Sequence, residues 1–382
     1  MKYFIIAGEQ SGDLHGSNLV KELLAADREA EIVCWGGDLM ESAGAKLLMH
    51  YKKSAFMGFV IILKNLGSIA ANLKLCRKQI TDYRPDVIIL IDYPGFNMRI
   101  AKFAKGSGFR VFYYISPKFW AWNERRVEKV KKYVDRMYII FPFETEFFKK
   151  HGMEVEYRGN PLVDETERRV HELPGREEIR KQINTGDKPV IALLAGSRRH
   201  EVESLLPQMV RVVNDFPEYQ FVLAGVKNLP DGLYEAIIVR ENVILVKEKT
   251  YEILHISDAA LVASGTATLE AALFNVPQVV CYKGDFFSML VAWIVIKVKY
   301  ISLVNLILNS EAVKEVLGYS VNRKNLSAEL RKILPGQPGR EKMLSDYKRL
   351  KEILGPAGAS ARIARDMVRE LRTRGSEGER AG

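Results

Sequence analysis

The sequence predicts an α/β protein built from two Rossmann-like domains, each with a doubly wound parallel sheet. Short apolar runs without polar alternation recur along the chain, which is typical of parallel strands covered on both faces. Each run is followed by a turn and a helical pattern, as in βαβ units. The runs form two sets, separated by a charged stretch at 164–178. We therefore expect two sheets whose strand ends face a cleft.

The first set of apolar runs begins directly after the N-terminus. Its five members are rich in β-branched and aromatic residues, and they are Tyr3–Ala7, Ile32–Trp35, Val87–Ile91, Val111–Ile115 and Met137–Phe141. The second set has the same character and consists of Val190–Leu194, Phe221–Ala224, Val243–Val246, Ala259–Val262 and Val279–Tyr282. After the last run the pattern becomes helical, with helices expected over Met343–Leu354 and Ala359–Leu371.

The turn at Gly159-Asn160-Pro161, ahead of the charged stretch, is the expected domain boundary. We predict an N-terminal domain over residues 1–163, which faces an acceptor or a membrane, and a second domain over residues 164–340. The remaining 341–382 are predicted as C-terminal helices with a frayed tail. These helices could pack on the first domain or on a second subunit, so a homodimer stays open.

Composition narrows the classes of function. The chain has 57 Lys and Arg against 47 Asp and Glu, a formal net charge of +10, which suits an anionic ligand or an anionic membrane surface. The cysteines are far apart and the histidines show no ligand spacing, so we expect a reducing cytoplasm and neither a metal nor a cofactor. No basic stripe carries interleaved aromatics, so nucleic acid is not expected. The apolar stretch 286–296 is too short to span a membrane.

In the first domain, the loops after two strands could carry chemistry. The first strand leads into Gly8-Glu9-Gln10-Ser11-Gly12-Asp13, which misses the dinucleotide spacing of a nicotinamide dehydrogenase. The third strand leads into Asp92, which could accept a proton from a hydroxyl in the crevice. The alternative for Asp92 is a turn or helix-capping role, since Pro94 and Gly95 follow.

An aromatic and basic loop follows the fourth strand. It holds Trp120 together with Arg125 and Arg126. This composition could bind phosphate or an acidic lipid. The alternative is a core tryptophan beside a solvated helix face.

The second domain offers two small-residue loops. Gly196, Ser197 and Arg198 open one helix and could bind a diphosphate through N–H groups and a guanidinium. Gly265 and Thr266 open another, and Glu270 follows one turn later, where a carboxylate could hold both ribose hydroxyls. Each loop alone could be an ordinary capped turn, but two in one domain favour a nucleotide.

Taken together, the motifs resemble one family, the bacterial lipid-A-disaccharide synthases, which are glycosyltransferases of the GT-B fold. The matching motifs are collinear from residue 3 to about 320, and they are AGEQSGD (7–13), MGF (57–59), IDYPGFN (91–97), ISPKFWAW with ERR (115–126), FPFE (141–144), YRGNPLVD (157–164), LLAGSRRHEVESLLP (193–207), ASGTATLEAAL (263–273) and YISLVNLIL (300–308). Ala195 and Gly318 depart from the family pattern, which affects the expected geometry of their loops.

The resemblance implies an inverting, metal-independent transfer. UDP-2,3-diacylglucosamine would be joined to 2,3-diacylglucosamine 1-phosphate, giving a β(1→6) disaccharide and UDP at the cytoplasmic face of the inner membrane, with which the enzyme would associate peripherally. Asp92 would be the base, with Glu9 and Ser11 in the loop that faces the transferred sugar. The UDP and diphosphate would contact the second-domain residues Gly196, Ser197, Arg198, Gly265, Thr266, Glu270 and Asn305.

The acylated substrates also require an apolar surface. The apolar run 56–63 includes Met57 and Phe59, and it could form a core element or an exposed patch that binds acyl chains and the membrane. With Trp120, Arg125 and Arg126 it makes up the expected acceptor or membrane surface.

Three other functions remain in competition at this point. A UDP-N-acetylglucosamine 2-epimerase or another GT-B UDP-sugar transferase would also use two Rossmann-like domains. A muramyl-type transferase would take a polyprenyl pyrophosphate acceptor. A non-catalytic nucleotide-sugar sensor would bind UDP without needing Asp92.

Overall fold

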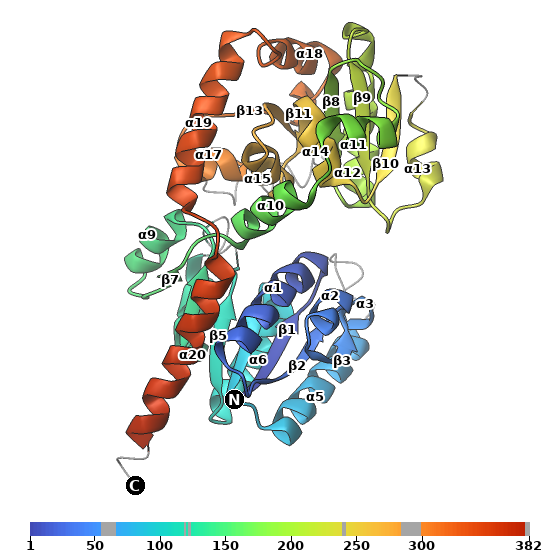
Figure 1. The fold of residues 1–382 in the computed structure, drawn as a ribbon. Helices are drawn as coiled ribbons and strands as arrows, with labels where there is room; N and C mark the ends of the chain where they lie inside the picture. The colour runs from blue at the N-terminus through green and yellow to red at the C-terminus, as the bar shows by residue number, and fades with distance from the viewer. Residues whose placement is uncertain (55–65, 118–119, 121–123, 239–241, 284–298, 379–382) are drawn as a thin grey trace. The chain divides into compact units, whose positions relative to one another are not determined.

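The computed structural model describes residues 1–54, 66–117, 120, 124–238, 242–283 and 299–378. The chain divides into two compact units (Figure 1). Unit 1 is Met1–Pro161 with Ala357–Gly382, and unit 2 is Leu162–Pro356. Each unit contains a single parallel sheet with helices around it, which confirms the predicted α/β class with two Rossmann-like sheets.

The sheet of unit 1 has the strand order β3-β2-β1-β4-β5-β6-β7, and all its pairs are parallel. Its strands are β1 Lys2–Ala7, β2 Glu31–Gly36, β3 Lys46–His50, β4 Val87–Ile91, β5 Arg110–Tyr114, β6 Arg136–Ile139 and β7 Glu156–Tyr157. Its helices are α1 Gln10–Ala26, α2 Asp38–Ser42, α3 Tyr51–Ser54, α5 Leu66–Tyr83, α6 Pro94–Gly106, the short 3₁₀ turn η1 Glu124–Arg126, α8 Val127–Tyr133, α9 Phe143–Lys150 and α20 Ala359–Gly378.

Both faces of this sheet are buried, which explains the unbroken apolar runs. On β1, Tyr3 and Ile5 face the core that α1 and α20 cover. The alternate residues Phe4 and Ile6 face the core under α5, α6, α8 and α9. A strand with this placement is therefore apolar on both sides, and the buried polar side-chain group of β1, the Tyr3 hydroxyl, donates to Asp27.

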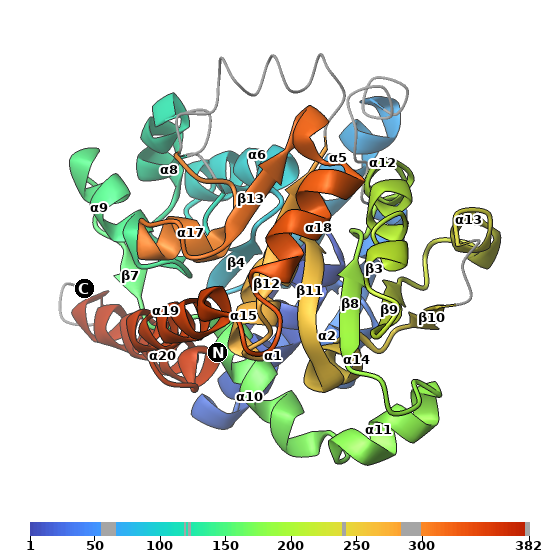
Figure 2. The same ribbon diagram turned by 90° about the horizontal axis from the view of Figure 1, so that it is seen from above.

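Unit 2 repeats the pattern with the strand order β10-β9-β8-β11-β12-β13, and Figure 2 shows its strands side by side. Its strands are β8 Val190–Leu194, β9 Gln220–Gly225, β10 Val243–Lys247, β11 Ser257–Ala263, β12 Gln278–Tyr282 and β13 Lys314–Leu317. Its helices and turns are α10 Pro161–Glu172, α11 Arg176–Ile183, α12 Arg199–Val210, η2 Val213–Asp215, α13 Asp231–Glu235, α14 Thr250–Ile256, α15 Thr266–Leu273, α17 Leu303–Leu308, η3 Gly318–Ser320, α18 Arg323–Arg331 and α19 Pro338–Leu354.

All ten predicted strands are present, and three further strands were not predicted. These three, β3, β7 and β13, lie at the edges of their sheets, as does β10, whose apolar run was predicted. The sequences of β3, β7 and β13 are short and include polar residues, so they lack the unbroken apolar run that marks a parallel strand.

The division into units differs from the predicted domains. The boundary lies at 161/162 instead of 163/164, and the predicted C-terminal segment 341–382 is not one part. Its first helix, α19, belongs to unit 2, where the Tyr347 hydroxyl donates to the Val276 carbonyl at 3.2 Å. Its second helix, α20, belongs to unit 1, where Ile363 and Met367 fill the core against α1. The apolar face of each helix decides which sheet it covers.

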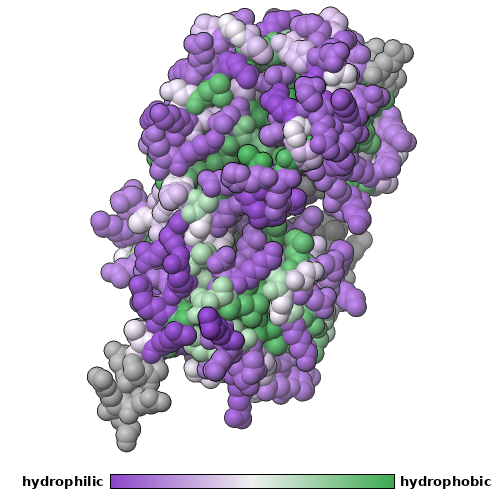
Figure 3. Space-filling view, viewed as in Figure 1, coloured by the Kyte–Doolittle hydropathy of each residue, from purple (hydrophilic) through white to green (hydrophobic). Residues whose placement is uncertain are grey.

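None of the helices in the described part of the chain combines the length and the apolar character needed to cross a membrane. On the face shown in Figure 3, hydrophilic residues cover most of the surface of each unit, with smaller apolar areas among them.

Candidate active site

The loops after β1 and β4 leave the sheet of unit 1 side by side. The two strands are paired in parallel, with Ala7 opposite Ile91 at their carboxyl ends. A Cβ atom on Gly8 would lie 2.2 Å from the Tyr93 ring, so glycine is required where this ring covers the first loop. The structure therefore brings the loop of Glu9 and Ser11 next to the loop of Asp92, as ligand binding beyond the strand ends requires.

Asp92 lies in a strained stretch of backbone. It is half-buried, and its φ of 42° and the φ of 49° at Tyr93 both fall in the left-handed region. That region costs most residues other than glycine about 1–2 kcal/mol and aspartate less, so the cost falls mainly on Tyr93. Such strain concentrates at active sites because the surrounding structure must enforce it. The observation favours a functional role for Asp92 over an ordinary turn residue.

Glu9 and Ser11 open helix α1. Glu9 is the extended residue before the helix, and its carbonyl accepts the Asp13 N–H at 2.9 Å. Ser11 is exposed in the first turn. Neither position is taken up by core packing, so both remain available for the predicted role near the transferred sugar.

Asp13 has a structural role that the sequence analysis did not assign. Its buried carboxylate accepts N–H groups at the start of α2, from Gly37 at 2.8 Å and from Leu39 and Met40 at 3.1 Å. A carboxylate at a helix N-terminus satisfies N–H groups that have no partner within the helix. Asp13 thereby fixes the distance between the first loop and α2.

Trp120, expected at an acceptor or membrane surface, is an interior residue. It is 9% exposed, its indole N–H donates to Glu144 at 3.1 Å, and its ring meets Phe143 edge to face at 5.0 Å. Arg125 is exposed and Arg126 is half-buried in η1. Met57 and Phe59 lie outside the described residues, so the predicted acyl surface stays a prediction.

Glu144 is a buried carboxyl group that the sequence analysis did not single out within its FPFE motif. It accepts hydrogen bonds from the Ser116 hydroxyl, the Trp120 indole and the Phe141 N–H. Burial raises the pKa of Glu144 to about 7, and these hydrogen bonds only partly offset that effect. Ser116 and Trp120 follow β5, so Glu144 anchors the loop beside that of Asp92.

In unit 2, the loops after β8 and β11 also leave from paired strands, with Leu194 opposite Val262. Gly265 and Thr266 begin α15, and a Cβ atom on Gly265 would meet nothing within 4 Å. The space around this backbone therefore permits the close approach of a ligand. The two predicted phosphate-binding loops are neighbours at one edge of the sheet.

The start of α12 is capped by the chain itself. Glu201 accepts the N–H of Ser197 at 3.0 Å and that of Arg198 at 3.2 Å. A Cβ atom on Gly196, whose φ is 104°, would lie 2.5 Å from the same carboxylate. The N–H groups of Ser197 and Arg198 thus already have an acceptor. The Arg198 side chain, 58% exposed and 3.8 Å from Glu201, is the group at this loop best suited to an incoming diphosphate.

Glu270 is held by a tyrosine that the sequence analysis did not identify. The Tyr251 hydroxyl donates to Glu270 at 2.9 Å, and its ring stacks on Phe274 with centroids 5.4 Å apart. Burial raises the pKa of the Glu270 carboxyl group above its usual value. One carboxylate oxygen is used by Tyr251, so the predicted contact with both ribose hydroxyls would have to share it.

Asn305 is buried, and its side-chain amide is fully bonded inside unit 2. Its Nδ2 donates to the Val313 carbonyl at 2.8 Å and to Glu315 at 2.9 Å. Its Oδ1 accepts the N–H groups of Ala312 and Val313 at 2.8 and 2.9 Å. In this structure the amide holds the turn before β13, and a nucleotide contact by Asn305 stays a prediction.

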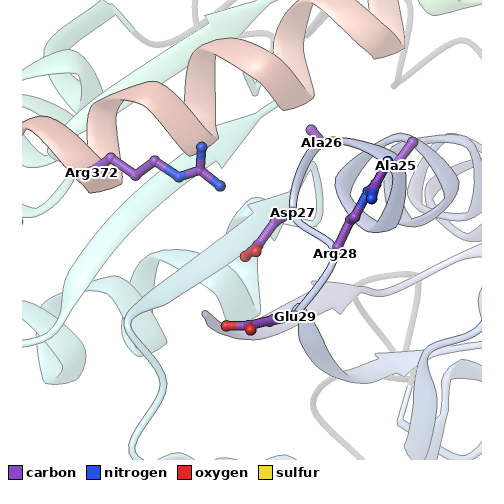
Figure 4. A pocket seen from close by; sticks show the side chains of 6 residues that line it. All are labelled: Ala25, Ala26, Asp27, Arg28, Glu29 and Arg372. Atoms are coloured by element: carbon purple, nitrogen blue, oxygen red, sulfur yellow. The ribbon is translucent and has the colours of Figure 1, made fainter.

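A separate pocket lies at the amino ends of the strands in unit 1, away from the loops after β1 and β4 (Figure 4). It has a volume of about 380 Å³ and is lined by Ala25, Ala26, Asp27, Arg28, Glu29 and Arg372. Asp27 accepts the N-terminal amino group and the Tyr3 hydroxyl, both at 3.0 Å, so it stabilises the start of β1. Within the described ranges, no cluster of three or more His, Cys, Asp or Glu side chains could hold a metal ion.

Comparison with known proteins identifies relatives along nearly the whole chain. A model of the family described as Lipid-A-disaccharide synthetase matches residues 3–361. The Lipid-A-disaccharide synthase of Geobacter metallireducens is 36% identical over 370 residues, which cover 95% of this chain and 95% of the relative. Lipid-A-disaccharide synthase 1 of Legionella pneumophila is 35% identical over 378 residues, covering 96% and 97%.

A solved structure shares the fold at much lower identity. The UDP-GlcNAc 2-epimerase from Neisseria meningitidis, solved bound to UDP-GlcNAc, has a TM-score of 0.68 and 13% sequence identity. The alignment covers 97% of this chain and 100% of the epimerase chain. At this identity the likeness concerns the fold and not the reaction.

Proposed function

The chain belongs to the lipid-A-disaccharide synthase family, and we propose that it condenses UDP-2,3-diacylglucosamine with 2,3-diacylglucosamine 1-phosphate. The products are the β(1→6) lipid A disaccharide 1-phosphate and UDP. The observation that carries the proposal is the family match over residues 3–361. The alternative epimerase reaction has only a shared fold in its favour.

The proposed reaction inverts the anomeric centre in a single displacement. The 6-hydroxyl oxygen of the acceptor attacks the anomeric carbon as the bond to the diphosphate oxygen breaks. The hydroxyl proton passes to a base, and the electron pair of the broken bond leaves with UDP. Catalysis then requires a positioned base and stabilisation of the diphosphate charge.

We assign the base to Asp92 in unit 1. Its half-buried position and left-handed backbone at the carboxyl end of β4 support this assignment. Glu9 and Ser11, in the adjacent loop, are proposed to contact the transferred sugar. Their roles follow from that neighbourhood and from the family motif.

We assign donor binding to unit 2. The Arg198 guanidinium is proposed to neutralise the diphosphate, because its side chain extends into solvent beside the start of α12. The backbone at Gly196, Gly265 and Thr266 is proposed to complete the phosphate site. A contact from the Ser197 N–H would require Glu201 to release this N–H. Glu270 is proposed to bind the ribose.

The decisive experiment incubates the protein with UDP-2,3-diacylglucosamine and the 1-phosphate acceptor and detects UDP and disaccharide by mass spectrometry. Asp92→Asn should lower kcat by about 10²–10⁴, the usual contribution of a general base. Native turnover by a folded Asp92→Asn protein would refute the base assignment. Absence of disaccharide formation by the native protein would refute the proposed reaction.

Arg198 can be tested against its neighbour. Arg198→Ala should weaken UDP binding by about 10-fold or more, because a hydrogen bond to a charged group contributes about 1.5–3 kcal/mol. Arg199→Ala is the matched control, since Arg199 pairs with Glu203 on the surface of α12. Equal effects of the two variants on UDP binding would contradict the assignment.

We also propose that the protein binds the membrane surface peripherally through unit 1. Arg125 is exposed in η1, and Lys129 and Lys132 are exposed on α8. Near an anionic surface each such charge is worth about 1 kcal/mol. Sedimentation with phosphatidylglycerol vesicles tests the apolar part through Phe59→Ser with Ile62→Ser, and unchanged binding would rule that part out.

A further inference from the structure

The left-handed backbone at Asp92 is held in place by two buried side chains. The Tyr113 hydroxyl donates to the Asp92 carbonyl at 2.6 Å, and the Asn97 amide donates to the same oxygen at 2.8 Å. The Asp92 N–H donates to the Tyr114 carbonyl at 3.2 Å. Both polar backbone groups of a strained residue are thus fixed from neighbouring elements, β5 and α6.

Asn97 is arranged to donate to this turn. Its Nδ2 donates to the Ile91 carbonyl at 3.2 Å as well as to Asp92, so it spans the end of β4. Its Oδ1 is buried and accepts no hydrogen bond within the described chain. A buried acceptor without a partner is unfavourable for stability. The Asn97 amide is therefore better explained by its hydrogen bonds to the Ile91 and Asp92 carbonyls than by a contribution to folding stability.

Tyr113 could be explained more simply, as a buried tyrosine whose hydroxyl needs an acceptor. That explanation does not account for why the acceptor is the Asp92 carbonyl. The hydroxyl meets the carbonyl of the one residue in this loop proposed to take a proton, and Asn97 converges on the same oxygen. Both side chains are fully buried, so neither can contact a substrate directly, and their shared hydrogen-bond acceptor is the Asp92 carbonyl.

We propose that Asn97 and Tyr113 are positioning residues that hold the Asp92 peptide in its left-handed conformation and thereby direct its carboxylate toward the acceptor hydroxyl. This inference rests on the proposed function. A base must sit within hydrogen-bond reach of the proton it removes, and small displacements of a catalytic group carry large losses in rate. Releasing the carbonyl should let the peptide relax to an ordinary conformation.

Tyr113→Phe tests the inference because it removes a single oxygen. We expect kcat to fall about 10- to 100-fold, with the Kd for UDP unchanged, since the donor residues are in unit 2. The matched control is Tyr3→Phe, which removes an equally buried hydroxyl from the same unit, one that donates to Asp27 at the other edge of the sheet. Its kcat should stay within about two-fold of native. Thermal unfolding curves show whether both variants are folded at the temperature of the kinetic assay.

A double-variant cycle separates positioning from a general structural effect. In the Asp92→Asn background, Tyr113→Phe should cause no further loss of the residual rate, because its effect acts through the carboxylate. An equal loss in both backgrounds would overturn the inference. Asn97→Ser, which replaces the amide with a shorter hydroxyl side chain, is the second variant and should give the same pattern.

The outcomes also separate this inference from the proposed function. Native kcat in Asp92→Asn would refute the base assignment itself. A slow Asp92→Asn protein together with native kcat in folded Tyr113→Phe or Asn97→Ser would refute only the positioning role.

Discussion

A buried carboxyl group lies behind the loop that follows β5. Glu144 accepts hydrogen bonds from Ser116, Trp120 and Phe141 in a buried site, and burial raises its pKa to about 7. The carboxyl group that accepts these three hydrogen bonds therefore changes its charge near neutral pH. The charge state of one side chain should influence the stability of the loop beside Asp92.

Glu144 should make stability depend on pH. Its pKa is 4.5 in the unfolded chain and about 7 in the folded protein, so the folded protein retains a proton that the unfolded chain loses. Its contribution is complete below pH 4.5 and is lost as pH rises through 7. Relative to the native protein, Glu144→Gln should gain stability between pH 5 and pH 7.5, measured by urea unfolding. The same stability difference at both pH values would contradict this.

Gly8 should tolerate no side chain. In Gly8→Ala the new methyl group would meet the Tyr93 ring at 2.2 Å, and overpacking of this kind costs about 1–3 kcal/mol. We expect lower thermal stability and slower turnover, because the ring lies next to Asp92. Gly106→Ala, at the end of α6 with nothing within 4 Å, is the control and should retain both properties. Equal behaviour of the two variants would count against the proposed contact.

At the scale of elements, the turn before β13 depends on one side chain. Asn305 on α17 donates two hydrogen bonds and accepts two across the turn. Glu315 on β13 also accepts the N–H groups of Ile301 and Ser302. The Ile301 carbonyl in turn accepts the Ser264 hydroxyl at 3.3 Å, next to Gly265. The network therefore connects the edge of the sheet with the second phosphate loop.

Asn305→Ala should destabilise unit 2 by more than about 2 kcal/mol. The substitution leaves the buried N–H groups of Ala312 and Val313 without an acceptor, at about 1–3 kcal/mol for each. Urea unfolding measures the loss. Asn325→Ala is the control, since the Asn325 amide makes an exposed bond to Ser320, and it should cost under about 1 kcal/mol. If Asn305→Ala instead abolishes UDP binding at native stability, the nucleotide contact is the correct role.

At the scale of the whole molecule, each unit has its own parallel sheet and its own core. The chain returns to unit 1 through α20, whose Glu370 forms a bidentate pair with Arg136 on β6 at 3.0 and 2.7 Å. Residues 234 positions apart thereby belong to one compact unit. A truncation before α20 would remove part of the core of unit 1.

Substitutions in the two C-terminal helices should destabilise different units. Met367→Ala on α20 and Leu350→Ala on α19 each remove a fully buried side chain, at about 2–5 kcal/mol. Hydrogen exchange should accelerate in β1 and β4 for Met367→Ala and in β8 and β11 for Leu350→Ala. Each variant serves as the control for the other. Equal acceleration in both sheets would show that the units do not unfold separately.

Much of this molecule could be predicted because its determinants are local. An unbroken apolar run such as Val87–Ile91 marks a central parallel strand, and the polar residue that follows it marks the functional edge. The edge strands β3, β7 and β13 could not be found this way, because their short sequences include polar residues and contain no such run, unlike the edge strand β10. The family motifs added the expected reaction and the choice of Asp92.

The amino-acid sequence was sufficient for the α/β class, the two sheets, ten of the strands and the family. Only the folded chain could decide that Glu144 meets Trp120, that Glu201 caps Ser197, that Asn97 and Tyr113 meet at Asp92, and that α20 completes unit 1. The physical reason is that apolar runs and turns depend on neighbouring residues. The partner of a buried polar group depends on which distant segments the packing of the core brings into contact.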